Sequence, residues 1–287
     1  MQSGRKKRTV ASELLTKKRT AELLGVSRSS LYYIPKLPTK DEHLKIEILE
    51  VLKDHPGYGY RRVAWALCLN KKQVQRVMVK FELQHKRKRK KKYKNQHTEP
   101  TFLVENYLAR ICPRFPGIVW QTDFTYLIYK NRTLYFATVI DRISREVLGV
   151  SLSFRHSGHL VREALQDAVL HHSTENLFCV HSDQGSEYLA EDTRAFIEQL
   201  GAFPSFSTKG SPWQNGHQES FYSRFKQEMG DLDRFKSIGH LLAEIYRFVG
   251  YYNTKRIHSA HKMPPTIYRL TTSQPTTMEP VSNKMGS

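Results

Sequence analysis

From residue 120 onward, strand-like and helix-like segments follow one another in an order that few folds accommodate. Three segments rich in β-branched and aromatic residues come first and predict an antiparallel start, with a hairpin about Asn131-Arg132. Helical and strand periodicities then alternate, and two long helical patterns complete the series. In chain order, the segments are the strands 120–130, 133–141 and 145–154, the helix 159–171, the strand 177–183, the helix 191–200, the strand 202–207 and the helices 218–229 and 238–252.

This order, βββαβαβα, is that of an RNase H-like domain: an α/β fold with a mixed five-stranded sheet flanked by helices. We assign the domain to 116–270. Before it, we expect small all-α modules: an N-terminal helix-turn-helix at 1–37 and a second helical DNA-binding module at 38–84, followed by a basic linker at 85–115. The Pro- and Thr-rich tail, 271–287, is expected to be irregular.

The positive charge of the chain is concentrated before this domain. The sequence has 46 Lys and Arg against 27 Asp and Glu, a net charge of +19; residues 1–98 contribute 26 basic and 8 acidic residues, and residues 99–287 contribute 20 and 19. This asymmetry is typical of a protein with a polyanion partner. No run approaches the ~18 apolar residues of a membrane span, and the N-terminus does not resemble a signal peptide. We therefore expect a nucleic-acid-binding protein in the cytoplasm.

The segment 17–33 predicts a helix-turn-helix. Its first helix ends at Gly25, and Ser27 caps a second helix. Val26 and Leu31 are expected to pack inward. A plain helical hairpin is the alternative interpretation. The second helix would carry Arg28, Ser29 and Ser30 outward, with Arg28 and Ser29 as expected DNA contacts.

The segment 38–84 predicts a second module of the same kind. Thr39-x-x-Glu42 is a capping-box pattern that indicates the start of a helix, and further helical patterns begin at Arg61 and Lys72. Four basic side chains are candidate phosphate contacts, with a solvated face as the alternative: Arg61, Arg62, Lys72 and Arg76.

Eight of the nine residues at 86–94 are Lys or Arg, which repel one another too strongly to fold alone. Each phosphate that such a linker neutralises would contribute roughly −0.9 to the log–log salt dependence of DNA binding. A merely solvated spacer is the alternative. The expected DNA contacts are Lys86, Arg87, Lys88, Arg89, Lys90, Lys91 and Lys92.

Three acidic residues stand where metal-dependent phosphoryl chemistry needs them. Asp123 lies within the first strand, in an apolar setting where an unligated charge is costly. Asp183 follows an apolar strand and emerges at its carboxyl end, where open sheets place ligands. Glu219 lies in the first turn of a helix whose opposite face is apolar. Taken singly, each is also explained as a turn former, a helix N-terminal charge or half of an ion pair.

Two divalent ions can activate an attacking oxygen and stabilise a leaving oxygen in DNA strand transfer. Mg²⁺ prefers hard oxygen ligands, so a few carboxylates suffice to hold it. Cys68, Cys112 and Cys179 are far apart and show no C-x-x-C spacing, so neither a disulfide framework nor a cysteine zinc site is indicated. We therefore expect two Mg²⁺ ions, with Mn²⁺ as a substitute.

Thirty-five residues separate Asp183 from Glu219, and with Asp123 this spacing resembles the DD(35)E signature of retroviral integrases and insertion-sequence transposases. The segments HSDQGSEY, KGSPWQNGHQESFYSRFK and YYNTKRIHSAHKMPPTIY resemble the IS3 family of bacterial transposases, specifically its larger OrfB-type product. HPGYGYRRVAWAL resembles that family's second helix-turn-helix segment. The resemblance covers most of 17–268. It departs from the family pattern at Gln214, where members often carry an acidic residue before Asn.

The resemblance implies a DDE-type DNA transposase that cleaves the 3′ ends of an insertion sequence and transfers them to DNA. It implies that Asp123 bridges both metal ions, with Asp183 completing one site and Glu219 the other. Lys226, seven residues after Glu219, would hold a phosphate near the transposon end. Three rings beside it are expected to stack on unpaired bases, with core packing or solvent exposure as the alternative: Trp213, His217 and Tyr222.

The implied partners are double-stranded DNA, both terminal inverted repeats and target, and further copies of the chain in a dimer or higher assembly. The smaller OrfA-type product is a further expected partner, and the place of action is the bacterial cytoplasm. Two other classes stay open at this point. One is a non-catalytic, sequence-specific DNA-binding regulator derived from a transposase, and the other is a nuclease of the same fold that cuts without joining.

Overall fold

The computed structural model describes four stretches of the chain: 17–32, 37–84, 105–208 and 212–272. They belong to two compact units, Met1–His85 and Lys86–Ser287. Within these stretches, no helix is long and apolar enough to cross a membrane.

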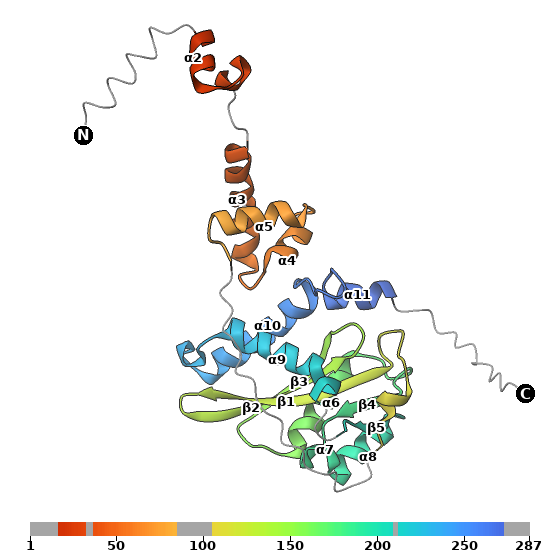
Figure 1. Ribbon diagram of the computed structural model, residues 1–287. Helices are drawn as coiled ribbons and strands as arrows, with labels where there is room; N and C mark the ends of the chain where they lie inside the picture. Colours follow the sequence, from red (N-terminus) through yellow and green to blue (C-terminus); the bar gives the residue numbers. More distant parts are fainter. Residues whose placement is uncertain (1–16, 33–36, 85–104, 209–211, 273–287) are drawn as a thin grey trace, which may run out of the picture. The chain divides into compact units, whose positions relative to one another are not determined.

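The first unit is helical, as predicted (Figure 1). It contains α2 (Lys17–Leu24), the 3-10 helix η1 (Arg28–Tyr32), α3 (Leu37–Asp54), α4 (Tyr60–Ala66) and α5 (Lys71–Lys80). The apolar periodicity of α3 to α5 forms its core, because residues three or four apart share one helix face. The buried apolar side chains of these helices and their connections are Leu44, Ile48, Tyr58, Val63, Ala64, Val74, Val77 and Met78.

The first helix-turn-helix prediction is wrong about its second helix. Arg28–Tyr32 form a single 3-10 helix of five residues. The hydroxyl of Ser27 lies 2.8 Å from those of Ser29 and Ser30, and such local side-chain hydrogen bonds compete with the α-helix. Val26, predicted to pack inward, is 43% exposed, because so short a turn offers no apolar face to cover it.

The capping-box prediction is wrong as well. The helix α3 begins at Leu37, so Thr39 lies inside its first turn. Pro38 does not prevent this start, because the N–H groups of a first turn have no partner within the helix.

The second unit is a mixed five-stranded sheet with helices on both faces, which confirms the predicted RNase H-like class. Its strands are β1 (Val119–Tyr129), β2 (Arg132–Asp141), β3 (Val147–Ser153), β4 (Cys179–Ser182) and β5 (Phe203–Phe206), and they lie in the order β3-β2-β1-β4-β5. The first three strands pair antiparallel, whereas β4 is parallel to both β1 and β5.

The turn between β1 and β2 lies one residue before the predicted position. Lys130 and Asn131 occupy it, with φ of 47° and 57°. Two consecutive positive φ angles are typical of the tight hairpin turn whose twist matches that of the strands. This hairpin fixes the register in which Asp123 lies opposite Thr138.

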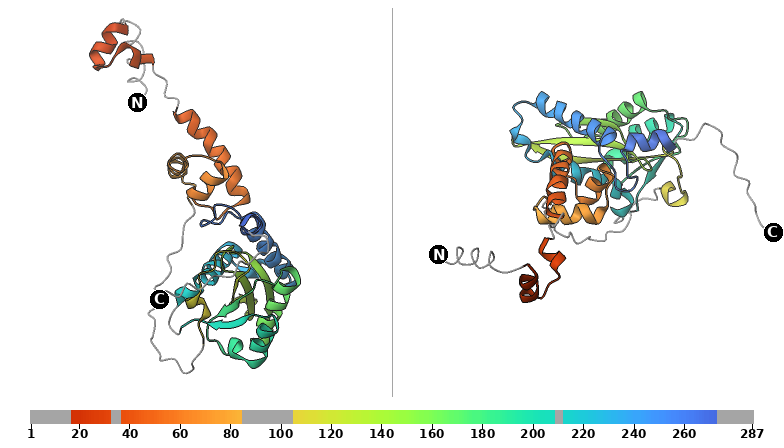
Figure 2. Two further views of the ribbon diagram at one scale, coloured as in Figure 1. Left: turned by 90° about the vertical axis from the view of Figure 1, so that its right-hand side faces the viewer. Right: turned by 90° about the horizontal axis from the view of Figure 1, so that it is seen from above.

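Helices cover both faces of the sheet (Figures 1 and 2). On one face are α6 (Gly158–His171), α7 (Ser186–Leu189) and α8 (Glu191–Gln199), which enclose Trp120, Val139 and Leu165. On the other are α9 (Gly216–Met229) and α10 (Ile238–Thr254), which enclose Phe136, Phe225 and Phe248. Two 3-10 helices, η3 (Pro212–Asn215) and η4 (Leu232–Arg234), flank α9.

A segment predicted within the linker packs on this unit. The 3-10 helix η2 (Tyr107–Arg110) lies against β5, where the carbonyl of Glu105 accepts a hydrogen bond from the Phe206 N–H at 3.0 Å. The ring of Tyr107 is centred 5.0 Å from that of Phe203. These contacts extend the packed unit to residue 105, eleven residues before the predicted boundary.

A last helix, α11 (Pro265–Thr272), extends two residues into the segment predicted as an irregular tail. Pro265 presets the dihedral angle of a first helical position. Thr266 and Arg269 on this helix hydrogen-bond the buried carboxylate of Glu146. The prediction was wrong here because the helix depends on a partner 120 residues earlier in the sequence.

Candidate active site

Two of the three predicted acids are brought together by parallel strand pairing. Gln121 on β1 lies opposite His181 on β4. Asp123 lies two residues further along β1, and Asp183 follows the last residue of β4. Since both chains run in the same direction, the two carboxylates lie at the same end of the sheet.

Glu219 is placed by hydrogen bonds between α9 and the sheet. The side-chain amide of Gln218 donates to the carbonyl of Gln121 at 2.7 Å, and its oxygen accepts from the Thr138 hydroxyl at 2.9 Å. One turn later, the Tyr222 hydroxyl donates to the Asp123 carbonyl at 2.5 Å. These bonds hold the first turn of α9 against β1 and β2, and Glu219 is exposed in that turn.

The Asp123 carboxyl is half-buried among other acids. Burial, followed by the charges of Asp183, Glu219 and Glu187, raises its pKa to about 8. Its Oδ1 accepts a hydrogen bond from the N–H of Phe124 at 2.8 Å, which opposes the shift. Within the stretches that the structure describes, no Lys, Arg or His forms an ion pair with it. The three predicted acids are therefore electrostatic neighbours, with Asp123 in the centre.

Asp183 is more exposed than Asp123. Desolvation by the surrounding chain nevertheless raises its pKa above the ordinary range, and the charge of Glu187 adds to this. Its Oδ1 accepts the N–H of Gly185 at 3.0 Å, which orients the carboxylate. Both aspartates thus favour the arrival of positive charge.

Among the described residues, no three His, Cys, Asp or Glu side chains are grouped closely enough to hold a metal ion as they stand. The donor set nevertheless fits a hard divalent cation, because it consists of carboxylates and its charge lacks a protein cation. Exposed Asp183 and Glu219 side chains can change rotamer around the fixed Asp123. The three acids therefore fit a divalent cation by the chemistry of their oxygen atoms and by lying in one region of the structure.

A fourth acid, Glu187, was missed by the sequence analysis. Its side chain is buried in α7, with one oxygen 3.8 Å from Nε2 of His156. A Cβ on Gly185 would come within 2.4 Å of its Oε1, so the neighbouring glycine makes room for the carboxylate. The signal was present in the sequence: Glu187 follows Asp183 by four residues.

Comparisons with known proteins identify the family. A family model described as "Integrase core domain" matches residues 113–212, and a second with the same description matches 200–265. The chain is 34% identical to the transposase for insertion sequence element IS904 of Lactococcus lactis subsp. lactis (strain IL1403), over 76% of this chain and 89% of that protein. It is also 34% identical to the transposase InsF for insertion sequence IS3A of Escherichia coli (strain K12), over half of each chain. The chain belongs to the IS3 family of insertion-sequence transposases.

This transposase is a DDE-type polynucleotidyl transferase by family, as the sequence motifs predicted. Among solved structures, the simian T-cell lymphotropic virus intasome in complex with PP2A regulatory subunit B56 gamma is similar over 84% of this chain and 80% of that one, at 14% identity and a TM-score of 0.49.

The predicted stacking role of Tyr222 in the transposase is wrong. Its ring is 6% exposed and its hydroxyl bonds the main chain of β1, because the aromatic face of α9 packs on the sheet. His217 is half-buried, and desolvation with the charges of Arg145 and Arg142 lowers its pKa to about 3. Lys226 is exposed, with its Nζ 4.8 Å from the ring centre of Tyr126. The side chain of Trp213 lies outside the described residues.

The DNA contacts predicted for the first unit of the transposase differ in their surroundings. Arg28, Ser29 and Arg61 are exposed, and Arg62 lies over the ring of Tyr58 at 5.7 Å. Arg76 forms an ion pair with the buried Asp41 at 2.5 Å, a structural role that the sequence analysis missed. The seven basic residues at 86–92 lie outside the described residues.

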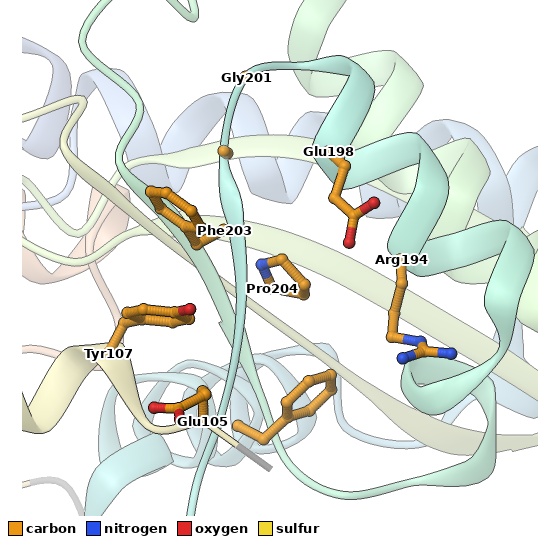
Figure 3. Close-up of a pocket in the computed structure, with 9 residues that line it drawn as sticks. Glu105, Tyr107, Arg194, Glu198, Gly201, Phe203 and Pro204 are labelled. Atoms are coloured by element: carbon orange, nitrogen blue, oxygen red, sulfur yellow. The ribbon is translucent and has the colours of Figure 1, made fainter.

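The transposase also has a pocket of about 480 Å³ at the β5 edge, between η2 and α8 (Figure 3). Its lining includes Glu105, Tyr107, Arg194, Glu198 and Phe203. None of the three predicted acids lines it, so its size gives no reason to place the chemistry there.

Proposed function

We propose that this transposase cleaves the 3′ ends of its insertion sequence and transfers them to a second DNA site, using Asp123, Asp183 and Glu219 to hold two Mg²⁺ ions. The observation that supports the proposal is the placement of Asp183 and Glu219 beside the half-buried Asp123, whose pKa is raised first by burial and then by the charges of these two acids. Such a cluster is costly without a cation and is typical of a catalytic site.

Hydrogen bonds to the sheet hold the helix that carries Glu219. Gln218 and Tyr222 bond main-chain carbonyls of β1, which holds the first turn of α9, and with it the backbone of Glu219, against the strand of Asp123. Bound there, Mg²⁺ or its substitute Mn²⁺ would activate the attacking oxygen and stabilise the leaving oxygen of an in-line displacement. Lys226, on the exposed face of α9, is proposed to hold a flanking phosphate.

Two successive displacements account for the reaction. Water attacks the phosphodiester that joins the 3′-terminal nucleotide of the transposon to the flanking DNA. The P–O3′ bond of that nucleotide breaks, which leaves a free 3′-hydroxyl on the transposon and a 5′-phosphate on the flanking strand. That hydroxyl then attacks a second phosphodiester, forming one P–O bond as another breaks. Neither step needs a covalent link to the protein, because the nucleophile is an oxygen of water or DNA.

We also propose the molecules with which the transposase acts. Double-stranded transposon ends and target DNA are the substrates, and acting on two ends calls for at least two copies of the chain. The exposed Arg28, Ser29 and Arg61, the half-buried Arg62 and the basic residues at 86–92 are proposed to contact DNA. A smaller OrfA-type product is a further proposed partner, and the bacterial cytoplasm is the proposed place of action.

A strand-transfer assay on labelled transposon-end DNA tests the proposal. We expect joining with Mg²⁺ and none with EDTA, and we expect Asp123→Asn to lower joining by at least about 10³-fold, since such charge-stabilising groups each contribute on that order. DNA affinity should not change. Asp192→Asn, an exposed acid on α8, is the matched control. Cleavage without joining would indicate a nuclease, and binding without either step would indicate a regulator.

A further inference from the structure

The turn between β2 and β3 carries two arginines whose acidic neighbours are hydrogen-bonded to other groups. Asp141 accepts hydrogen bonds from the N–H groups of Gly117 at 2.7 Å and Ser144 at 2.6 Å. Glu146, at the other end of the turn, is bonded by Thr266 and Arg269. Neither carboxylate forms an ion pair with the two arginines between them, Arg142 and Arg145.

Both arginines are partly buried and neither has an ion-pair partner among the described residues. The Nη1 atom of each is enclosed by protein and has no hydrogen-bond partner. Desolvation lowers the pKa of Arg142, and desolvation followed by the charge of Arg142 lowers the pKa of Arg145 to about 10. Enclosing two guanidinium groups side by side is strongly unfavourable unless an anion joins them.

Further hydrogen-bond donors lie near this turn. The first turn of α9 starts beside this turn, because Gln121, which lies opposite Ile140, donates to the carbonyl of Gln214 at 2.9 Å. The N-cap of α9, Asn215, makes no side-chain capping bond, and the N-terminal end of a helix carries partial positive charge. His261 also has an enclosed nitrogen, Nε2, without a partner. The positive end of a helix dipole favours a bound anion.

We propose that Arg142, Arg145 and the start of α9 form a site for one backbone phosphate of the bound DNA. The N–H of Arg142 bonds the carbonyl of Val119, four residues before Asp123 on β1, which is about 13 Å at the rise of a strand. That span corresponds to about four 3.4 Å base steps of a DNA strand. The site would therefore hold the duplex close to, but apart from, the acids. This inference rests on DNA being the substrate, and it does not depend on the metal assignment.

DNA binding in EDTA tests the site without any chemistry. Fluorescence anisotropy on transposon-end duplex would compare the wild type with the double variant Arg142→Gln/Arg145→Gln over a range of salt concentrations. We expect at least tenfold weaker binding and a log–log salt slope smaller by about one, the loss of one phosphate contact. Arg234→Gln/Lys236→Gln is the charge-matched control. It removes two charges near Phe235, whose carbonyl contacts Tyr129 at the far end of β1, and should leave the slope nearly unchanged.

A second measurement separates an anion site from a cavity that holds only water. Inorganic phosphate should raise the Tm of the wild type more than chloride of equal ionic strength, because a ligand bound to the folded state alone stabilises it. The double variant should lose that difference. Unchanged DNA affinity and slope in a folded double variant would overturn the proposal, and so would a wild-type Tm that phosphate does not raise. If Asp123→Asn still joins DNA, the catalytic assignment fails while this site stands.

Discussion

The hydroxyl of Tyr222 donates a hydrogen bond to the main-chain carbonyl of Asp123, with 2.5 Å between the two oxygens. This bond joins the helix that carries Glu219 to the strand that carries Asp123. The Tyr222 side chain is 6% exposed, so water does not compete for it. The spacing of two acids from distant parts of the sequence therefore depends on a buried polar contact.

Removal of that hydroxyl should slow joining without weakening DNA binding. In Tyr222→Phe the ring still fills the core, while the carbonyls of Asp123 and Phe136 lose a donor. We expect joining to slow by about tenfold, the cost of a loosened active-site position, and stability to fall by about 1 kcal/mol. Tyr246→Phe, at an exposed position of α10, is the control. An unaltered joining rate would show that the bond does not position Glu219.

Metal affinity should rise with pH up to about 8. Because the pKa of Asp123 is about 8 in the folded protein and ordinarily 3.8, protons compete with the metal below pH 8. The apparent affinity for Mg²⁺ should increase by about tenfold per pH unit below 8 and level off above it. Titration calorimetry between pH 6 and pH 9 measures this, with Asp123→Asn as the variant expected to lose the dependence. A flat wild-type profile would contradict the assignment.

The same shift predicts how stability varies with pH in EDTA. Between pH 4 and pH 8 the folded chain retains a proton on Asp123 that the unfolded chain has lost, so this carboxyl lowers the free energy of unfolding as pH rises. Asp123→Asn removes the loss. At pH 8 we expect the variant to be more stable than the wild type by about 1–3 kcal/mol, the usual cost of an uncompensated buried polar group. Urea unfolding at pH 5 and pH 8 measures the difference.

A buried ion pair should stabilise the helix of Glu219. Arg256, 3% exposed after α10, lies 2.6 Å from the carboxylate of Glu228 on α9. Glu228→Gln leaves that guanidinium enclosed without its counter-charge, and we expect a loss of about 3 kcal/mol. Glu244→Gln is the control, because Arg247 in that pair is 75% exposed and such pairs contribute at most about 1 kcal/mol. Equal losses in the two variants would contradict the expectation.

Gly149 marks a close approach of β3 and α6. A Cβ at this position would lie 2.2 Å from the carbonyl oxygen of Ala164 and 2.5 Å from the nitrogen of Ala168. Gly149→Ala must therefore push the helix from the sheet, and we expect a loss of about 1–3 kcal/mol. Gly250→Ala, where a Cβ meets open space on α10, should instead be neutral or gain up to about 1 kcal/mol. Thermal unfolding compares the two.

The elements of the second unit could be predicted because their residues reveal local periodicity. The helical patterns of α6, α8, α9 and α10 lie within two residues of the observed bounds. The approach of Asp123 and Asp183 follows from two parallel strands. Contacts between distant segments left no such local pattern, and α11 depends on Glu146 in this way.

The candidate site shows the same division. Spacing and setting indicated the three acids, but burial assigned Tyr222 to the core and brought Glu187 beside them. From the sequence, a tyrosine on an aromatic helix face could equally pack in the core or stack on a DNA base. The charge of Arg142 and Arg145 was visible in the sequence, but their lack of an ion pair in the described part of the chain depends on which partners Asp141 and Glu146 already have.

The most direct test of the account measures Mn²⁺ binding by electron paramagnetic resonance at pH 8. It compares the wild type with Asp123→Asn, Asp183→Asn and Glu219→Gln. If the three carboxylates share the metal, each variant should bind Mn²⁺ at least about tenfold more weakly, as the loss of a ligand or its support does, and Asp192→Asn should bind as the wild type does. Wild-type affinity in Glu219→Gln would contradict the convergence of these acids on one site.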